Sequence, residues 1–185
     1  MIITNQREKL LNAIIYFCHN TKYCGKTKLM KLLYFLDFIH FKQTGKSVTG
    51  LDYFAWEMGP VPRGLYEELD SMNPDLAKAI TILPQDEFQK ICAKQKFDDR
   101  YFTQRQMKLL KTISDIFFEA KADLMVESTH LKNHPWDKTI KSKGKFQKID
   151  YLLAIDDDKD SLSYEEAKER KEEIEEMHKI FGLHG

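Results

Sequence analysis

Residues Lys22–Phe41, KYCGKTKLMKLLYFLDFIHF, contain the most apolar helical segment of the sequence. From residue 28 to residue 42, leucine, methionine, isoleucine and phenylalanine occupy most sides of a helix with 3.6 residues per turn. A helix that is apolar on nearly all sides belongs inside a protein, surrounded by other elements. The sequence therefore predicts a mainly helical α+β fold, in which a helical bundle surrounds a central apolar helix at about 28–42 and carries a small β-sheet.

The triplet Gly25-Lys26-Thr27 at the start of this segment is also found at the end of phosphate-binding loops. Such a loop needs a second glycine five residues earlier and a strand before it, because its backbone amides must wrap the phosphates. Here Asn20 takes that earlier position, and the preceding residues have helical spacing. We interpret the triplet as a turn that begins a helix.

Capping residues and apolar spacing place the other elements around the central helix. Asn5 with Glu8, Thr103 with Gln106, and Ser163 with Glu166 each resemble a capping box. Two prolines exclude a helix from the turn at 58–62. We expect helices at 5–19, 63–72, 103–118, 123–131 and 163–181, and short strands at 52–57, 79–83 and 88–95. A helical turn is the alternative for 88–95.

The 185 residues favour one domain with an acidic appendage. Net charge is zero overall, but residues 151–185 carry eleven Asp and Glu against five Lys and Arg, a net of −6. We expect a body at 1–150 and, at 151–185, an acidic loop followed by an amphipathic helix that docks on the body or on a partner. Three cysteines without a C-x-x-C pair indicate reduced thiols. With no signal peptide and no membrane span in the sequence, we predict a cytoplasmic protein.

The sequence contains few residues in a context typical of catalysis or metal binding. The histidines lack the spacing of a metal site, and no nucleophile has a sequence context that would activate it, so we expect no catalytic residues, no metal and no cofactor. One alternative is a hydrolase built around Asp37, His40 and His130. Another is a DNA-binding regulator that uses the basic segment Lys22–Lys31, although nucleic acid is not the expected partner because the helix continues with Leu and Phe.

Three stretches, taken in order, resemble the Panacea family, which is also described as SocA-like antitoxins and phage-associated GepA-like proteins. They are KLMKLLYF at 28–35, YFAWEMGPVP at 53–62 with Leu65-Tyr66, and ESTH at 127–130 before Pro135-Trp136. Together they span about 25–137. The positions that we expect to bind a partner are Lys31, Tyr34, Trp56, Met58, Pro60, Val61, Thr129, His130 and Trp136.

The resemblance implies the antitoxin of a toxin–antitoxin system with a role in phage defence, not an enzyme. Its partner would be a cognate protein toxin encoded by an adjacent gene, neutralised by direct protein–protein binding. A protease or a chaperone is a further partner that the resemblance allows. The acidic final segment would suit a basic toxin.

Overall fold

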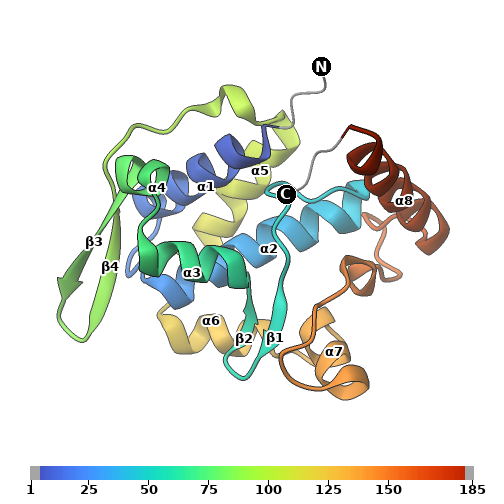
Figure 1. The fold of residues 1–185 in the computed structure, drawn as a ribbon. Coiled ribbons are helices and arrows are strands. Elements are labelled where there is room, and N and C mark those ends of the chain that lie inside the picture. The colour runs from blue at the N-terminus through green and yellow to red at the C-terminus, as the bar shows by residue number, and fades with distance from the viewer. Residues whose placement is uncertain (1–4, 182–185) are drawn as a thin grey trace.

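The computed structural model describes residues 5–181 (Figure 1). It confirms a mainly helical α+β fold, with two antiparallel two-stranded sheets in the described residues where one small sheet was expected. β1 (Phe54–Trp56) pairs with β2 (Gly59–Val61), and β3 (Ile80–Gln85) pairs with β4 (Phe88–Ala93). The helices are α1 (Gln6–Asn20), α2 (Lys26–Thr44), α3 (Arg63–Ser71), α4 (Pro74–Ala79), α5 (Gln104–Ile116), α6 (Ala122–Thr129), α7 (Pro135–Lys143) and α8 (Tyr164–Phe181), with 3₁₀ turns η1 (Asp99–Tyr101) and η2 (Tyr151–Ala154).

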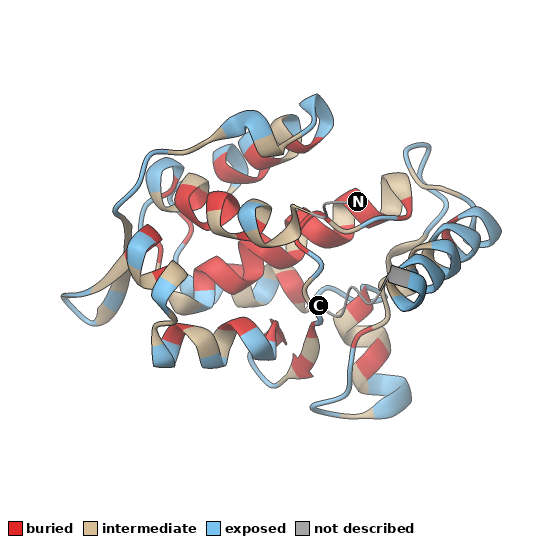
Figure 2. Ribbon diagram, turned by 45° about the horizontal axis from the view of Figure 1, so that its top comes forward, coloured by how far each residue is buried: buried red, intermediate tan, exposed pale blue. Residues whose placement is uncertain are grey.

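Helix α2 is the central element, as the sequence predicted. It contacts α1, α5, α6, α8, β2, β4 and η2, and Figure 2 shows it as the longest continuous run of buried residues. Leu29, Leu32, Leu33 and Leu36 are completely buried. The helix ends at Gly45, whose φ of +72° is left-handed and whose N–H donates to the carbonyl of Phe41 at 2.7 Å.

A buried lysine holds the end of α5 against the start of α2. The Lys28 ammonium, 1% exposed, donates to the carbonyls of Lys22 at 2.6 Å and of Phe117 and Ala120 at 2.7 Å. The carbonyls of Phe117 and Ala120 lie just past the last turn of α5, where backbone carbonyls have no N–H partner within the helix. Burial lowers the pKa of Lys28 to about 8.

A buried carboxylate holds the loop after α2. Asp37 accepts hydrogen bonds from the N–H groups of Val48 and Thr49 at 2.8 Å, from the Thr49 hydroxyl at 2.5 Å and from the Tyr53 hydroxyl at 2.7 Å. Burial raises its pKa, and these four donors oppose that rise because they favour the ionised form. Asp37 is therefore a fully satisfied structural residue that fixes 45–53 over the central helix.

Two predicted capping boxes are confirmed and one is wrong. The Thr103 hydroxyl accepts from the N–H of Gln106, whose side chain accepts from the N–H of Thr103. Ser163 and Glu166 make the equivalent pair at α8. Asn5 makes no side-chain cap bond, since its backbone, with ψ of +35°, does not have the extended geometry of a capping residue.

Two helices were not predicted, and each begins at a proline. Pro74 starts α4 and Pro135 starts α7, positions where the sequence was interpreted only as a break. A proline is favoured in the first turn of a helix, because its missing N–H would have had no helical partner there. Both prolines thus end one segment and begin the next.

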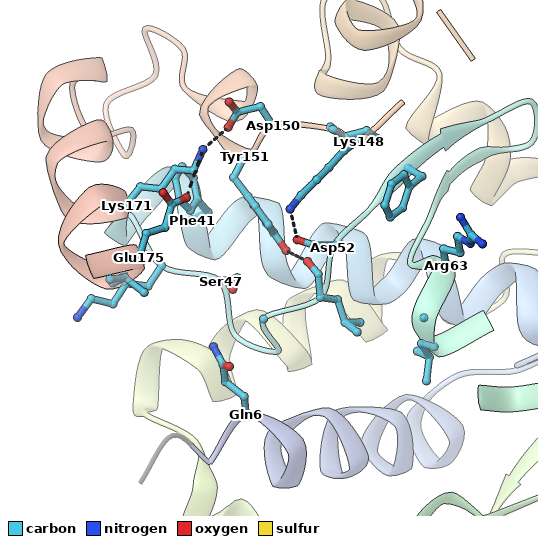
Figure 3. A pocket seen from close by; sticks show the side chains of 18 of the residues that line it. Gln6, Phe41, Ser47, Asp52, Arg63, Lys148, Asp150, Tyr151, Lys171 and Glu175 are labelled. Carbon is cyan, nitrogen blue, oxygen red and sulfur yellow. Dashed lines mark hydrogen bonds and ion pairs between the residues drawn. The ribbon is translucent and has the colours of Figure 1, made fainter. Parts of the chain in front are cut away.

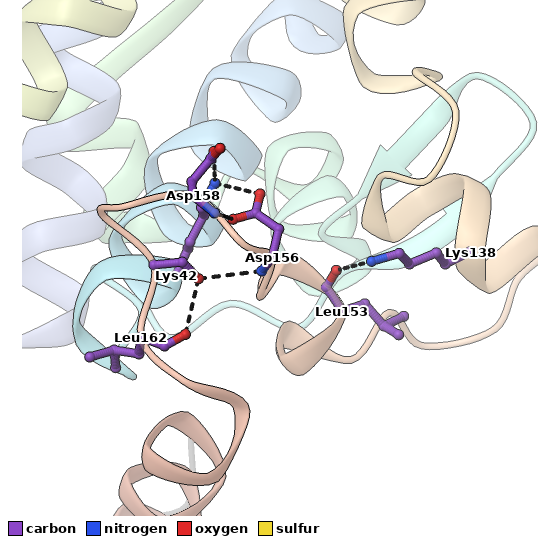
Figure 4. A network of polar contacts seen from close by, with 7 residues as sticks. Lys42, Lys138, Leu153, Asp156, Asp158 and Leu162 are labelled. Carbon is purple, nitrogen blue, oxygen red and sulfur yellow. Dashed lines mark hydrogen bonds and ion pairs between the residues drawn. The ribbon is translucent and has the colours of Figure 1, made fainter.

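The acidic segment docks on the body mainly through polar contacts. Lys42 of α2 donates to Asp156 and Asp158 at 2.5 Å, and the N–H of Leu162 donates to the Lys42 carbonyl at 2.9 Å (Figure 4). Along α8, Ala167 is completely buried, whereas Ile180 is 75% exposed. The amphipathic helix therefore packs at its first half and leaves apolar surface beyond it.

The Thr103 cap provides a test of local stability. We expect Thr103→Ala to lower the free energy of unfolding by about 1 kcal/mol, because the N–H of Gln106 loses its acceptor. Urea unfolding measures the change. Thr112→Ala, at an exposed position in the same helix, is the control and should change stability by less than about 0.5 kcal/mol; equal losses from both variants would show that the cap does not contribute.

Candidate functional site

The three stretches that carry the family resemblance meet in space. Lys31 of α2 donates to the carbonyl of Pro60 in β2 at 2.8 Å. Gly59, the residue before Pro60, has a φ of +94°, and a Cβ built on it would be 2.6 Å from the Thr129 hydroxyl of α6 and 3.2 Å from the Lys31 ammonium. Helix α2, strand β2 and helix α6 approach this closely only because residue 59 has no side chain.

A second contact joins the β1–β2 hairpin to α7. The Trp136 indole N–H donates to the carbonyl of Trp56 at 2.8 Å. The His130 ring stacks on the Trp136 ring, with centroids 3.8 Å apart and planes 8° apart. Burial, with a smaller contribution from the charge of Lys31, lowers the pKa of His130.

The motif residues that meet here form what we call the interior cluster: Lys31, Tyr34, Gly59, Thr129, His130 and Trp136. Burial within this cluster favours the neutral forms of its titratable side chains. Lys31 is 1% exposed, and burial lowers its pKa to about 7. Tyr34, one turn further along α2 and also buried, has a raised pKa for the same reason. Its ring packs on Phe38 and Tyr53, with centroids 4.4 and 5.7 Å away.

The nine predicted partner-binding residues therefore lie mostly inside the protein. Met58 is 60% exposed, at the turn of the hairpin. Trp56, His130 and Trp136 are half-buried, and the buried ones are Lys31, Tyr34, Pro60, Val61 and Thr129. The structure brings their elements together, and their binding of a partner stays a prediction.

Two of these residues, Trp56 and Met58, belong to a surface whose other members were not predicted. The Trp56 ring lies between those of Tyr66 and Phe146, with centroid distances of 5.3 and 6.2 Å, and Phe146 is 60% exposed. With Met58 on the adjoining turn, these residues form what we call the hairpin surface: Trp56, Met58, Tyr66 and Phe146.

Phe146 reaches this surface because residues 146–147 form backbone hydrogen bonds with β1 and so extend the β1–β2 sheet. The N–H of Phe146 donates to the carbonyl of Ala55, and the N–H of Ala55 donates to the carbonyl of Gln147, at 2.8 and 2.9 Å. Phe146 has φ of +63°, a left-handed conformation that is costly for a bulky residue. An isolated Phe between polar residues gives no sequence signal of this placement.

The hydrolase alternative has no shared site in the structure. Asp37 is saturated with hydrogen-bond donors, and His40 Nδ1 contacts the carbonyl of Lys46 at 2.6 Å. His130 stacks on Trp136 instead. None of Asp37, His40 and His130 lines either of the two surface hollows described below.

The basic segment at the start of α2 is largely used within the fold. Lys28 and Lys31 are buried, Lys22 pairs with Glu119 at 2.6 Å, and Lys26 pairs with Asp70. Such lysines are poorly placed to neutralise DNA phosphates. Gly25 directly precedes α2 in extended conformation, as a turn that begins a helix requires.

Two surface hollows flank the central helix. The larger, about 970 Å³, lies between α8, the start of α3 and the loop at 45–52, with Tyr151 and Phe41 among its lining residues (Figure 3). Its charges are largely paired: Lys148 with Asp52 at 2.8 Å, and Lys171 with Asp150 at 2.9 Å. The smaller, about 730 Å³, lies beside Tyr23 and Phe88.

No cluster of three or more His, Cys, Asp or Glu side chains in residues 5–181 is suited to hold a metal ion. No helix in that range combines the length and apolar character that crossing a bilayer requires.

Comparison with known proteins gives one match. The family described as antitoxin SocA-like, Panacea domain, matches residues 29–137, more than half of the chain. The chain belongs to this family. No curated protein and no solved structure matches it. The matched region runs from the buried part of α2 to Asp137, so it covers the interior cluster but ends before Phe146 and α8.

Proposed function

We propose that this Panacea-domain protein is the antitoxin of a toxin–antitoxin pair and neutralises its cognate protein toxin by direct binding. Family membership is the observation that carries the proposal. The partner would be the product of the adjacent gene, and the pair would act in phage defence. In the same proposal, both proteins are cytoplasmic, the antitoxin is not an enzyme, and a protease or chaperone is an additional partner.

The hairpin surface is the proposed contact site. Aromatic and methionine side chains are enriched at protein interfaces because they bury a large area. Trp56 and Met58 would touch the toxin, and the buried motif residues, such as Lys31 and Thr129, would hold the hairpin in place.

The acidic segment is the proposed source of attraction over longer distances. Its net charge of −6 would speed the encounter with a basic toxin. Several carboxylates of α8, including Glu169, Glu172 and Glu176, are exposed and so remain able to act on a partner.

The proposal is tested by expressing the adjacent gene with and without this chain. We expect the adjacent gene alone to stop growth, and co-expression to restore it with both proteins eluting together. Toxicity that persists despite folded, soluble antitoxin would contradict neutralisation. Restored growth without a complex would contradict direct binding.

The contact surface is tested by Met58→Asp with Phe146→Asp. Two charges on exposed apolar positions should leave the fold intact but weaken toxin binding by at least about 100-fold, since central interface residues contribute roughly 2 kcal/mol or more each. Leu83→Asp is the matched control, because Leu83 is 48% exposed on the separate β3–β4 hairpin. Calorimetric titration of purified toxin into each variant gives the affinities; equal affinity for both variants would place the interface elsewhere.

A further inference from the structure

Two of the three cysteines are in contact. Cys18, in the last turn of α1, and Cys24, just before α2, have their sulfurs 3.8 Å apart, within hydrogen-bond distance for thiols. Both are free. They lie six residues apart in sequence, across the turn that connects the two helices.

The two thiols differ in access to solvent. Cys24 is completely buried, and its carbonyl accepts a hydrogen bond from Ile91 of β4 at 2.7 Å. Cys18 is half-buried, so it is the more exposed residue of the pair. A small oxidant that enters from solvent would therefore meet Cys18 before Cys24.

The surroundings of the pair favour a shared thiolate. The Cys18 thiol, the Thr21 hydroxyl and the positive charges of Lys28 and Lys90 together lower the pKa of Cys24 against the effect of burial. The hydrogen bond to Cys24 and burial raise the pKa of Cys18, so the negative charge of the pair rests mainly on Cys24 and the Cys18 thiol donates to it. Transfer of that one proton between the adjoining sulfurs gives the Cys18 thiolate. Thiolates, not thiols, react with peroxides.

We propose that Cys18 and Cys24 are a redox-active pair that forms a reversible intramolecular disulfide when the protein meets a peroxide. In the first step the Cys18 proton passes to the Cys24 thiolate, the Cys18 thiolate so formed attacks hydrogen peroxide, the O–O bond breaks, and uptake of one proton gives Cys18 sulfenic acid and water. In the second step Cys24 sulfur attacks Cys18 sulfur and a second water leaves. Overall, two thiols and one peroxide give one disulfide and two waters.

The third cysteine provides an internal control. Cys92 is half-buried on β4, next to Ile91, so it is near the pair and similar to Cys18 in exposure. Within residues 5–181, the recorded sulfur–sulfur contact joins Cys18 and Cys24, and none involves Cys92. Contact, not exposure alone, predicts which pair is oxidised.

Trypsin separates all three cysteines. Cys18 falls in the peptide 10–22, Cys24 in 23–26 and Cys92 in 91–94, because lysines end each of these segments. The folded full-length chain is treated with hydrogen peroxide, remaining thiols are alkylated at acidic pH, and the digest is analysed by mass spectrometry without reduction.

We expect the 10–22 peptide linked to 23–26 to exceed all other linked peptides by at least about tenfold, because the two sulfurs already adjoin. Free thiols should fall from three to one, and dithiothreitol should restore three. Cys92→Ser should give the same linked peptide at the same rate. In Cys18→Ser, the buried Cys24 should remain reduced.

Three outcomes would overturn the proposal: linkage of either cysteine to Cys92 at comparable yield, stable sulfinic acid at Cys18 without linkage, or survival of both thiols under peroxide that oxidises a free cysteine peptide. None of these depends on the toxin. The test therefore separates this inference from the proposed antitoxin function.

Discussion

Replacing Gly59 with alanine should lower the free energy of unfolding by about 3 kcal/mol or more. The new Cβ would lie 2.6 Å from the Thr129 hydroxyl and 3.1 Å from Lys31 Cε, so α2, β2 or α6 must shift. The backbone φ of +94° adds strain for any residue with a side chain. Overpacking and strain each cost about 1 to 3 kcal/mol. Urea unfolding followed by circular dichroism measures the loss.

Two further variants separate the effect of the steric clash at residue 59 from the effect of replacing any glycine with alanine. Gly64→Ala, in α3, meets no atom within 4 Å and should raise stability by up to about 1 kcal/mol. Combining Gly59→Ala with Thr129→Ala removes the nearest clashing atom and should recover part of the loss. If Gly59→Ala were as stable as the wild type, the close approach of the three motif stretches would be wrong.

Replacing Lys31 with methionine should remove a large dependence of stability on pH. The pKa of Lys31 is about 7 in the folded protein, against 10.5 for an ordinary lysine. Between these values the unfolded chain binds more protons than the folded one, so stability rises with pH and is lowest at pH 7 and below. One such group contributes about 1.4 kcal/mol per pH unit, or roughly 4 kcal/mol from pH 7 to pH 10.

The difference between wild type and Lys31→Met isolates this residue, because Lys28 contributes to the pH dependence of both. Urea unfolding at pH 7, 8, 9 and 10 should show the wild type gaining stability relative to the variant by several kcal/mol. Lys108→Met, at an exposed position of α5, is the control and should run parallel to the wild type. Parallel curves for Lys31→Met would mean that its ammonium is solvated and not enclosed under the hairpin.

Much of the fold follows from local patterns in the sequence. The apolar character of 28–42 places α2 at the centre, and the Thr103 and Ser163 boxes mark the starts of α5 and α8. These features depend on neighbours in the chain, which a sequence displays directly. The starts of α4 and α7 were missed because a proline is compatible both with the end of one helix and with the start of another.

The interior cluster could be predicted only in part. The motif stretches indicated which residues belong together, but lysine normally lies at the surface. Burial of Lys28 and Lys31 depends on carbonyl acceptors at Ala120 and Pro60, which are distant in sequence. For this reason the lysines at the start of the central helix suggested a nucleic-acid contact in the sequence, although two of them are buried in the structure.

The outer surface was predicted less well than the interior. Trp56 and Met58 were predictable as a contact surface, because aromatic and thioether side chains precede a rigid Gly-Pro-Val-Pro turn. Phe146 joins them only through backbone pairing between its segment and β1, about ninety residues earlier in the chain. Its left-handed backbone also has no signature in the adjoining residues.

Direct binding of the toxin is measured by titrating this chain with the purified product of the adjacent gene. We expect a saturable complex with a dissociation constant of about 1 µM or tighter, equal affinity for Leu83→Asp and a loss of at least about 100-fold for Met58→Asp with Phe146→Asp. Absence of binding by the folded wild-type chain, with a toxin that is active in the same preparation, would contradict neutralisation by direct binding.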